Sequence, residues 1–254
     1  MKNIRTEFIG ALGDRLSAII SLPEDSEVKS YAVYSHCFTC NKNYKIINSI
    51  SRVLTRRGIG VFRFDHSGLG DSEGDFSKTT FRSNVLDLQL AAEYLKVNYS
   101  PPKLLIGHSL GGATCIAAAN TIQGIKGVVT IASPSSLTHL RDSLNRLIII
   151  NPLDGTKHAE IGGENYIIGD SMLESLREDM LERHVEELNL PLLVMQGTKD
   201  YSVTMAEAER LFKMARQPKS FVTVAGGGHL MPDRTSSEYV AKIIASWFSL
   251  YEIN

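Results

Sequence analysis

Short apolar runs of strand length alternate along this chain with longer segments that carry apolar residues at helical spacing. The strand-like runs are residues 30–35, 59–65, 104–106, 127–132, 192–195 and 220–224. The helix-like segments are residues 41–57, 82–98, 112–119, 205–215 and 237–251. Because this alternation is typical of a parallel sheet with helices on both faces, the pattern predicts an α/β fold.

Two further strand-like segments lie before the first of these runs. Residues 7–12 and 15–22 flank Gly13 and Asp14, residue types that favour tight turns. This arrangement predicts an antiparallel hairpin. Together with the later runs, it predicts a mostly parallel sheet of eight strands.

The stretch from about residue 137 to residue 189 breaks the alternation, and we name it the cap segment. Gly162 and Gly163 stand between two short β-prone runs, which predicts a hairpin. Residues 171–188 have apolar residues on one helical stripe, and Ser171 and Glu174 have the spacing of a capping box. We expect the cap segment to cover the active edge of the sheet, within one domain of residues 1–254.

Composition narrows the possible functions. The chain has 254 residues, of which 43% are hydrophobic and 22% charged, with a formal net charge of -1 and no basic stripe. These features argue against nucleic acid as a partner. No apolar run is long enough to span a bilayer, and the first residues lack the apolar stretch of a secretory signal. With three cysteines, the chain fits a reducing cytoplasm better than a disulfide scaffold.

The most specific motif is Gly-His-Ser-Leu-Gly at residues 107–111. A strand-like run precedes this G-x-S-x-G pattern and a small-residue helix follows it, which is the context of a nucleophile elbow. Glycine suits the flanks of so sharp a turn because it has no side chain. We therefore predict that Ser109 is a catalytic nucleophile rather than a helix-capping serine.

A serine nucleophile needs a histidine base and a carboxylate that fixes the tautomer of that base. In this architecture the chain order is serine, acid and histidine. Of the seven histidines, only His229 follows the last predicted strand, after three glycines that we expect to give its loop freedom of movement. Asp200 follows strand 192–195, whereas the loop after strand 127–132 offers no carboxylate. We predict His229 as the base and Asp200 as the acid.

An oxyanion hole needs two backbone N–H donors. We expect one from Leu110, which follows the nucleophile at the start of a helix, and the other from Phe38, in the loop after strand 30–35. We expect His36 to bond the backbone of that loop. Cys37 and Cys40 form a C-x-x-C pattern, but no second pair completes a metal site, and we expect two small side chains that line the loop.

Residues 63–74 form a second glycine-rich segment. It lacks the lysine and the glycine spacing of a phosphate-binding loop. We expect a structural loop beside the site, in which Asp65 and Asp71 cap turns.

Together these residues resemble the α/β-hydrolase superfamily along nearly the whole chain. The chain further resembles a bacterial subgroup in which the hydrolase module is often fused to a downstream OsmC-like domain. The residues that carry this resemblance are segments 36–40, 63–76, 104–112 and 218–221. Because the chain stops just after the last predicted helix, we expect no OsmC-like domain here. The resemblance implies Ser109 as nucleophile, Asp200 as acid and His229 as base.

We therefore expect a carboxylesterase-like serine hydrolase that cleaves small carboxylic esters or thioesters through an acyl-enzyme. Its partner would be a small acyl substrate, and the chemistry requires neither a metal nor an organic cofactor. Two alternatives stay open at this point. They are a serine peptidase or amidase of the same fold, and a non-catalytic binding protein on a hydrolase scaffold.

Overall fold

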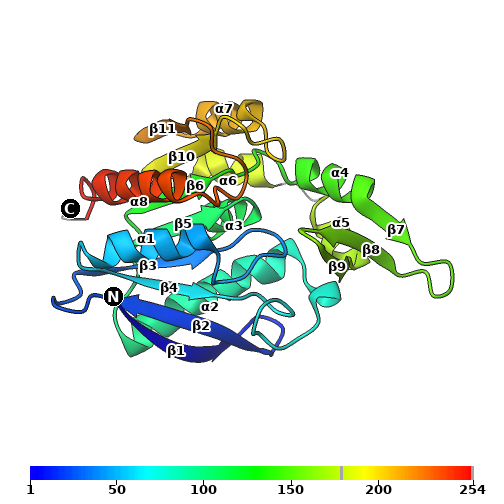
Figure 1. Ribbon diagram of the computed structural model, residues 1–254, viewed down its shortest axis with the longest axis horizontal. Helices are drawn as coiled ribbons and strands as arrows, with labels where there is room; N and C mark the ends of the chain where they lie inside the picture. Colours follow the sequence, from blue (N-terminus) through cyan, green and yellow to red (C-terminus); the bar gives the residue numbers. More distant parts are fainter. Residues whose placement is uncertain (178–179, 253–254) are drawn as a thin grey trace.

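The computed structural model describes residues 1–177 and 180–252. Its main sheet has eight strands in the order β1-β2-β4-β3-β5-β6-β10-β11, and all pairings beyond β4 are parallel (Figure 1). The strands are β1 (Lys2–Ile9), β2 (Arg15–Leu22), β3 (Ser30–Ser35), β4 (Ile59–Phe64), β5 (Leu104–His108), β6 (Gly127–Ile131), β10 (Leu192–Gly197) and β11 (Lys219–Val224). The mostly parallel sheet predicted from the sequence is confirmed, with β1 and β2 as its antiparallel hairpin.

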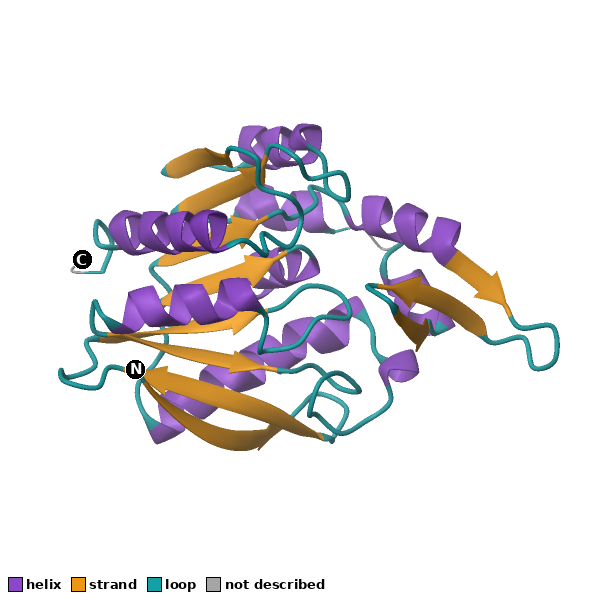
Figure 2. Cartoon of the chain, viewed as in Figure 1, coloured by secondary structure: helices purple, strands orange, loops and turns teal. Residues whose placement is uncertain are grey.

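Helices cover both faces of this sheet (Figure 2). One face carries α1 (Lys45–Thr55) and α8 (Arg234–Phe248), whose apolar stripes share a core cluster with β3, β5, β6 and β10. The other carries α2 (Phe81–Asn98), α3 (Leu110–Ala119), α6 (Leu181–Glu187) and α7 (Met205–Met214). The central strands are buried on both sides, which explains why they read as continuous apolar runs.

Two predicted boundaries at the start of the chain are wrong. The first strand runs over Lys2–Ile9 instead of residues 7–12, because residues 10–14 form the turn of the hairpin. The first helix starts at Lys45 instead of residue 41, because Lys42 is drawn into contact with Asp65. Gly58, with φ of 85°, follows this helix as expected.

In its described residues, the cap segment forms a small sheet and three helices. The sheet has the order β7-β8-β9, from β7 (Ile148–Ile150), β8 (Lys157–Ile161) and β9 (Glu164–Ile167). The predicted hairpin at Gly162 and Gly163 is confirmed, and α4 (Leu137–Leu147) and β7 were not predicted. In Figure 1 this sheet projects beyond the main sheet, on the side where α4 also lies.

The predicted helix over residues 171–188 is wrong as one element. The structure has α5 (Asp170–Ser175) and α6 there, and Glu178 and Asp179 of the prediction lie outside the described residues. The predicted capping box is also wrong, because Gly169 is the N-cap of α5 and no side chain caps this helix. The apolar stripe that we expect on this helix consists of Met172, Leu176 and Met180. Met172 and Leu176 are buried, but Met180 is 47% exposed, so the stripe is confirmed only in part.

The parallel strands all direct their carboxyl ends to one edge of the sheet. The loops after β3, β5, β10 and β11 therefore meet there. None of the helices in the described part of the chain has the length and apolar character needed to cross a membrane.

Candidate active site

Ser109 occupies the sharp turn between β5 and α3. Its backbone has φ of 54° and ψ of −120°, a conformation that residues with a side chain rarely adopt. A Cβ added to Gly107 would lie 2.1 Å from the carbonyl oxygen of Gly111, and one added to Gly111 would lie 2.2 Å from that of Ser35. The two glycines of the motif thus permit backbone contacts that fix the strained turn and hold up the Ser109 side chain.

Asp200 follows β10 and is nearly buried. Its Oδ2 accepts a hydrogen bond from His229 Nδ1 at 2.9 Å, and its Oδ1 accepts from the amides of Ser202 and Val203, each at 2.9 Å. Burial alone would raise the pKa of Asp200, but the bonds from His229 and these amides outweigh it and lower the pKa. Asp200 is therefore a carboxylate that keeps a proton on His229 Nδ1 and leaves Nε2 free to act as a base.

We expect from the sequence that three glycines give the His229 loop freedom of movement. In the structure this loop instead packs tightly against the loop after β10. The Lys199 amide donates to the carbonyl oxygen of Gly227 at 2.8 Å, and the Gly226 amide donates to Thr198 Oγ1 at 2.8 Å. A Cβ on Gly197 would lie 2.3 Å from the Gly227 carbonyl oxygen. The glycines here allow two loops to touch, which sets His229 beside Asp200.

His108, the variable residue before the nucleophile, has a role that the sequence analysis missed. It is buried, and its Nε2 lies 2.8 Å from the backbone carbonyl oxygen of His229. Burial, followed by the nearby His229, lowers the pKa of His108 to about 3, so the ring is neutral at pH 7. Because a carbonyl only accepts, His108 Nε2 carries the proton and anchors the His229 loop. The only signal for this role was its place in the G-x-S-x-G motif.

The two predicted oxyanion donors lie on segments that touch. The close approach of Gly111 to Ser35 packs the start of α3 against the end of β3. Leu110 begins α3, and Phe38 lies in the loop after β3. Neither backbone N–H donates a hydrogen bond to another described residue, and both residues line the same cavity. Two unpartnered N–H groups beside a serine are what an oxyanion hole requires.

Cys37 and Cys40 are joined as a disulfide, whereas the sequence analysis expected two separate thiols. Their Cα atoms are 5.2 Å apart because the chain turns sharply between them, and the Cys40 amide donates to the Cys37 carbonyl oxygen. Both cysteines line the cavity. The ligand atoms of this pair and of His108 lie within 4.8 Å of one another, but disulfide sulfurs are not thiolate ligands. In this form only the His108 ring offers a metal ligand.

The cavity at this edge has a volume of about 600 Å³ and contains both Ser109 and His229. No hydrogen bond joins their side chains among the described residues. Such bonds commonly tighten only when substrate binds. The cavity walls come from both the main fold and the cap segment. Their apolar and aromatic members include Phe38, Tyr44, Leu140, Leu144, Leu147, Ile161, Tyr166 and Tyr201.

The loop of residues 63–76 supports the site from outside the cavity, which none of its residues lines. Asp65 is fully buried and accepts from Lys42 Nζ at 2.5 Å and from the Asp71 amide at 2.9 Å. Gly70, with φ of 56°, leaves room for the Asp65 carboxylate. Asp65 therefore binds the backbone of this loop, as expected, and ties the loop to the segment before α1. The Asp71 carboxylate instead accepts from Lys42 Nζ at 2.7 Å, so the expectation that Asp71 caps a turn is wrong.

Comparison with known proteins agrees with this geometry. A family model described as serine aminopeptidase, S33, matches residues 36–150. The crystal structure of the esterase domain of a Rhodothermus marinus protein is 35% identical, has a TM-score of 0.82, and covers 99% of this chain and 100% of its own. Est1E from Butyrivibrio proteoclasticus, solved with ferulic acid bound, has a TM-score of 0.81 at 19% identity and covers 98% of this chain and 100% of its own.

Curated sequences show similar relationships. Human monoglyceride lipase is 27% identical over 225 residues, which are 75% of this chain and 74% of that protein. In curated relatives from Salmonella, the match covers 73% of this chain and 59% of the relative. The identity to the Rhodothermus marinus domain extends over both full chains and agrees with the sheet and the elbow described above. This chain therefore belongs to the α/β-hydrolase superfamily, among its serine hydrolases and esterases.

Proposed function

We propose that this protein hydrolyses small carboxylic esters or thioesters, with Ser109 as nucleophile, His229 as base and Asp200 as the orienting acid. The observation that carries the proposal is the convergence of three loops. The hydrogen bond of 2.9 Å between His229 and Asp200 leaves His229 Nε2 free, and His229 shares one cavity with Ser109. Leu110 and Phe38 line the same cavity.

In the first half of the reaction, Ser109 Oγ attacks the acyl carbon while its proton passes to His229 Nε2. The charge that develops on the carbonyl oxygen is held by the N–H groups of Leu110 and Phe38. Asp200 stabilises the resulting imidazolium without taking its proton. The tetrahedral intermediate then collapses, and the proton on Nε2 goes to the departing alcohol or thiol.

The second half releases the acid. Water enters the cavity, His229 Nε2 takes a proton from it, and the resulting hydroxide attacks the acyl group on Ser109. The same two N–H groups hold the second oxyanion. Collapse returns the proton to Ser109 Oγ and frees the carboxylic acid, so the enzyme ends as it began.

The cavity supports an acyl group of moderate size. A volume of about 600 Å³ lies within the range of small-molecule sites, and four of its walls are aromatic: Phe38, Tyr44, Tyr166 and Tyr201. Ferulic acid, an aromatic acid, is bound in the related fold of Est1E. We therefore include aromatic acids among the acyl groups and assign the cap segment the role of covering them.

A specific observation favours a second candidate, a serine aminopeptidase. The family model that matches residues 36–150 carries that description. Glu164, at the start of β9, lines the cavity and could pair with the ammonium group of a peptide. The triad would act in the same way on an amide.

A fluorophosphonate probe tests the nucleophile directly. We expect stoichiometric labelling of the wild type, loss of labelling in Ser109→Ala, and full labelling in Ser246→Ala, which changes an exposed serine on α8. Hydrolysis of p-nitrophenyl esters from acetate to palmitate, methyl ferulate and aminoacyl p-nitroanilides then separates esterase from peptidase. A folded wild-type protein that resists the probe and cleaves none of these compounds would instead be a binding protein.

A further inference from the structure

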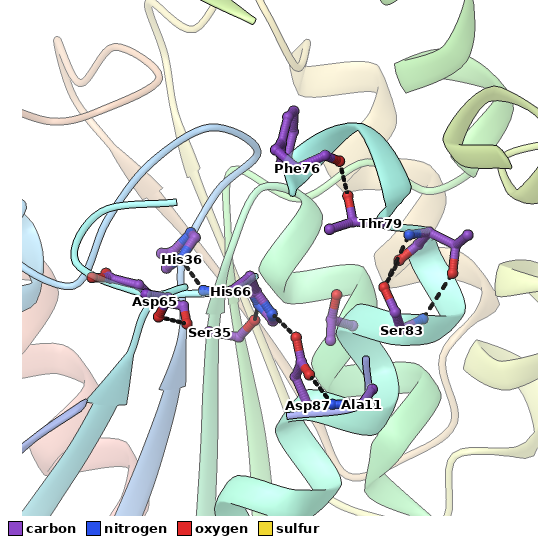
Figure 3. Close-up of polar contacts among 12 residues, drawn as sticks. Ala11, Ser35, His36, Asp65, His66, Phe76, Thr79, Ser83 and Asp87 are labelled. Atoms are coloured by element: carbon purple, nitrogen blue, oxygen red, sulfur yellow. Dashed lines mark hydrogen bonds and ion pairs between the residues drawn. The ribbon is translucent and has the colours of Figure 1, made fainter. Parts of the chain in front are cut away.

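A buried histidine–carboxylate pair lies outside the proposed catalytic machinery (Figure 3). His66 follows β4, and its Nδ1 lies 3.0 Å from Oδ2 of Asp87 on α2. The side chains are only 5% and 2% exposed. The other carboxylate oxygen, Asp87 Oδ1, accepts from the Ala11 amide at 2.8 Å. Both oxygens of Asp87 are thus occupied, and the His66 ring is held in one orientation.

His66 is connected through His36 to the loop of residues 36–40 after β3, which we name the oxyanion loop because it carries the proposed donor Phe38. The backbone amide of His66 donates to His36 Nε2 at 3.3 Å, and His36 Nδ1 lies 2.8 Å from the carbonyl oxygen of Cys37. Burial, followed by the proximity of His66, lowers the pKa of His36 to about 3, so its ring is neutral. Its proton is therefore on Nδ1, which must donate to the carbonyl, while Nε2 accepts. The two rings also meet edge to face, with centroids 4.9 Å apart.

The Cys37 carbonyl and the Phe38 N–H belong to the same peptide group. In a trans peptide these two bonds point in opposite directions. A donor that holds the carbonyl on one side therefore turns the N–H toward the other. The imidazole of His36 donates to this carbonyl at 2.8 Å and the Cys40 amide donates to it at 3.1 Å, and Phe38 lines the cavity.

The cluster of Ser35, His66 and Asp87 is not a second catalytic site. Ser35 Oγ lies 3.4 Å from His66 Nε2, which repeats the order serine, histidine and aspartate. Ser35 is fully buried, however, and does not line the cavity, so no substrate carbonyl can reach it there. The contacts of the cluster lead instead to the backbone of the oxyanion loop.

We propose that His66 and Asp87 are positioning residues for the oxyanion hole. They fix the chain of hydrogen bonds through His36 that aims the Phe38 N–H at the developing charge. This inference rests on the proposed function, because it presumes that Phe38 is an oxyanion donor. Removal of a whole donor costs roughly 10²–10³ in rate, and a misaligned donor should cost less.

The test compares Asp87→Asn and His66→Gln with the wild type on a p-nitrophenyl ester. We expect kcat to fall about tenfold with KM within about twofold, since the donor acts mainly on the transition state. We also expect the inhibition constant of a trifluoromethyl ketone, which forms a tetrahedral adduct with Ser109, to rise by the same factor. Affinity for the carboxylic acid product should stay unchanged.

Thr80→Ala provides the matched control on the same helix. It removes the hydrogen bond from the Ser83 amide that caps α2, and Thr80 does not line the cavity. It should lower the melting temperature without changing kcat or the inhibition constant. If Asp87→Asn and His66→Gln behave like Thr80→Ala, or if neither folds, the positioning role is overturned while ester hydrolysis stands. A wild-type protein that neither binds the fluorophosphonate nor cleaves esters would overturn both proposals.

Discussion

At the scale of single residues, His229 is held from two sides. Its Nδ1 donates to the Asp200 carboxylate, and its backbone carbonyl accepts from the neutral ring of His108. Asp200 in turn accepts from two backbone amides, so its position does not depend on His229 alone. These contacts fix the orientation of the imidazole before any substrate arrives, which lowers the cost of reorganisation during the reaction.

Asp200→Asn should keep the fold and lower turnover by roughly 10⁴, because the amide can stabilise the wrong tautomer of His229. Steady-state hydrolysis and thermal melting measure the two effects separately. Asp233→Asn, which changes the N-cap of α8 at a residue that does not line the cavity, should keep full turnover. If Asp200→Asn stays active, another carboxylate serves as the acid.

At the scale of elements, the contact between the end of β3 and the start of α3 brings together the two segments that carry the proposed oxyanion donors. A helix and a strand can approach this closely only where no side chain stands between them. Gly111 allows this approach because it has no side chain. A Cβ added to Gly111 would lie 2.2 Å from the Ser35 carbonyl oxygen and 2.6 Å from that of His36.

Gly111→Ala should therefore push α3 away from the oxyanion loop. We expect a loss of about 1–3 kcal/mol in the free energy of unfolding, as is typical of overpacking, together with a fall in kcat of at least tenfold. Urea unfolding and ester hydrolysis are the measurements. Ala117→Gly on the same helix should cost about 1 kcal/mol and leave kcat unchanged. Equal turnover in the two variants would contradict this account of Gly111.

At the scale of the whole molecule, burial of two neutral histidines links stability to pH. His36 and His108 lie beneath the site, and burial lowers the pKa of each to about 3. In the unfolded chain each ring binds a proton below about pH 6.5. Between about pH 6.5 and pH 3 the unfolded chain therefore binds more protons than the folded protein. As the pH is lowered through this range, the free energy of unfolding falls by up to about 1.4 kcal/mol per pH unit for each histidine.

His36→Asn should remove part of this pH dependence, since the asparagine amide can donate to the Cys37 carbonyl but does not titrate. Between pH 7.5 and pH 5.0 we expect the wild type to lose about 2 kcal/mol more than the variant in the free energy of unfolding. Urea unfolding of both proteins at the two pH values measures this difference. Parallel losses in both proteins would show that His36 does not titrate on unfolding.

Much of the main fold was predictable because its signals are local. The elbow strand, the elbow helix and the strands after them follow from apolar period and from glycine positions. The cap segment was predicted less well. Its helix over residues 171–188 is divided, and β7 leaves Ile149 about 75% exposed, so the apolar pattern there does not report burial in a core. The resemblance to fusions with an OsmC-like domain and the cytoplasmic location stay predictions.

The sequence by itself determined the order of the elements of the main sheet and the chemical types at the proposed site. A strained turn admits only certain residues, and a serine nucleophile needs a histidine and a carboxylate. Tertiary structure alone decided which side chains meet. Two of these contacts join positions far apart in the sequence: the bond from His108 to the His229 loop, and the chain of contacts from Asp87 to the Phe38 peptide. The disulfide between Cys37 and Cys40 depends on the shape of a turn that no local pattern fixes. Such contacts depend on how the packed strands and helices bring their loops to one edge, which is a property of the whole core.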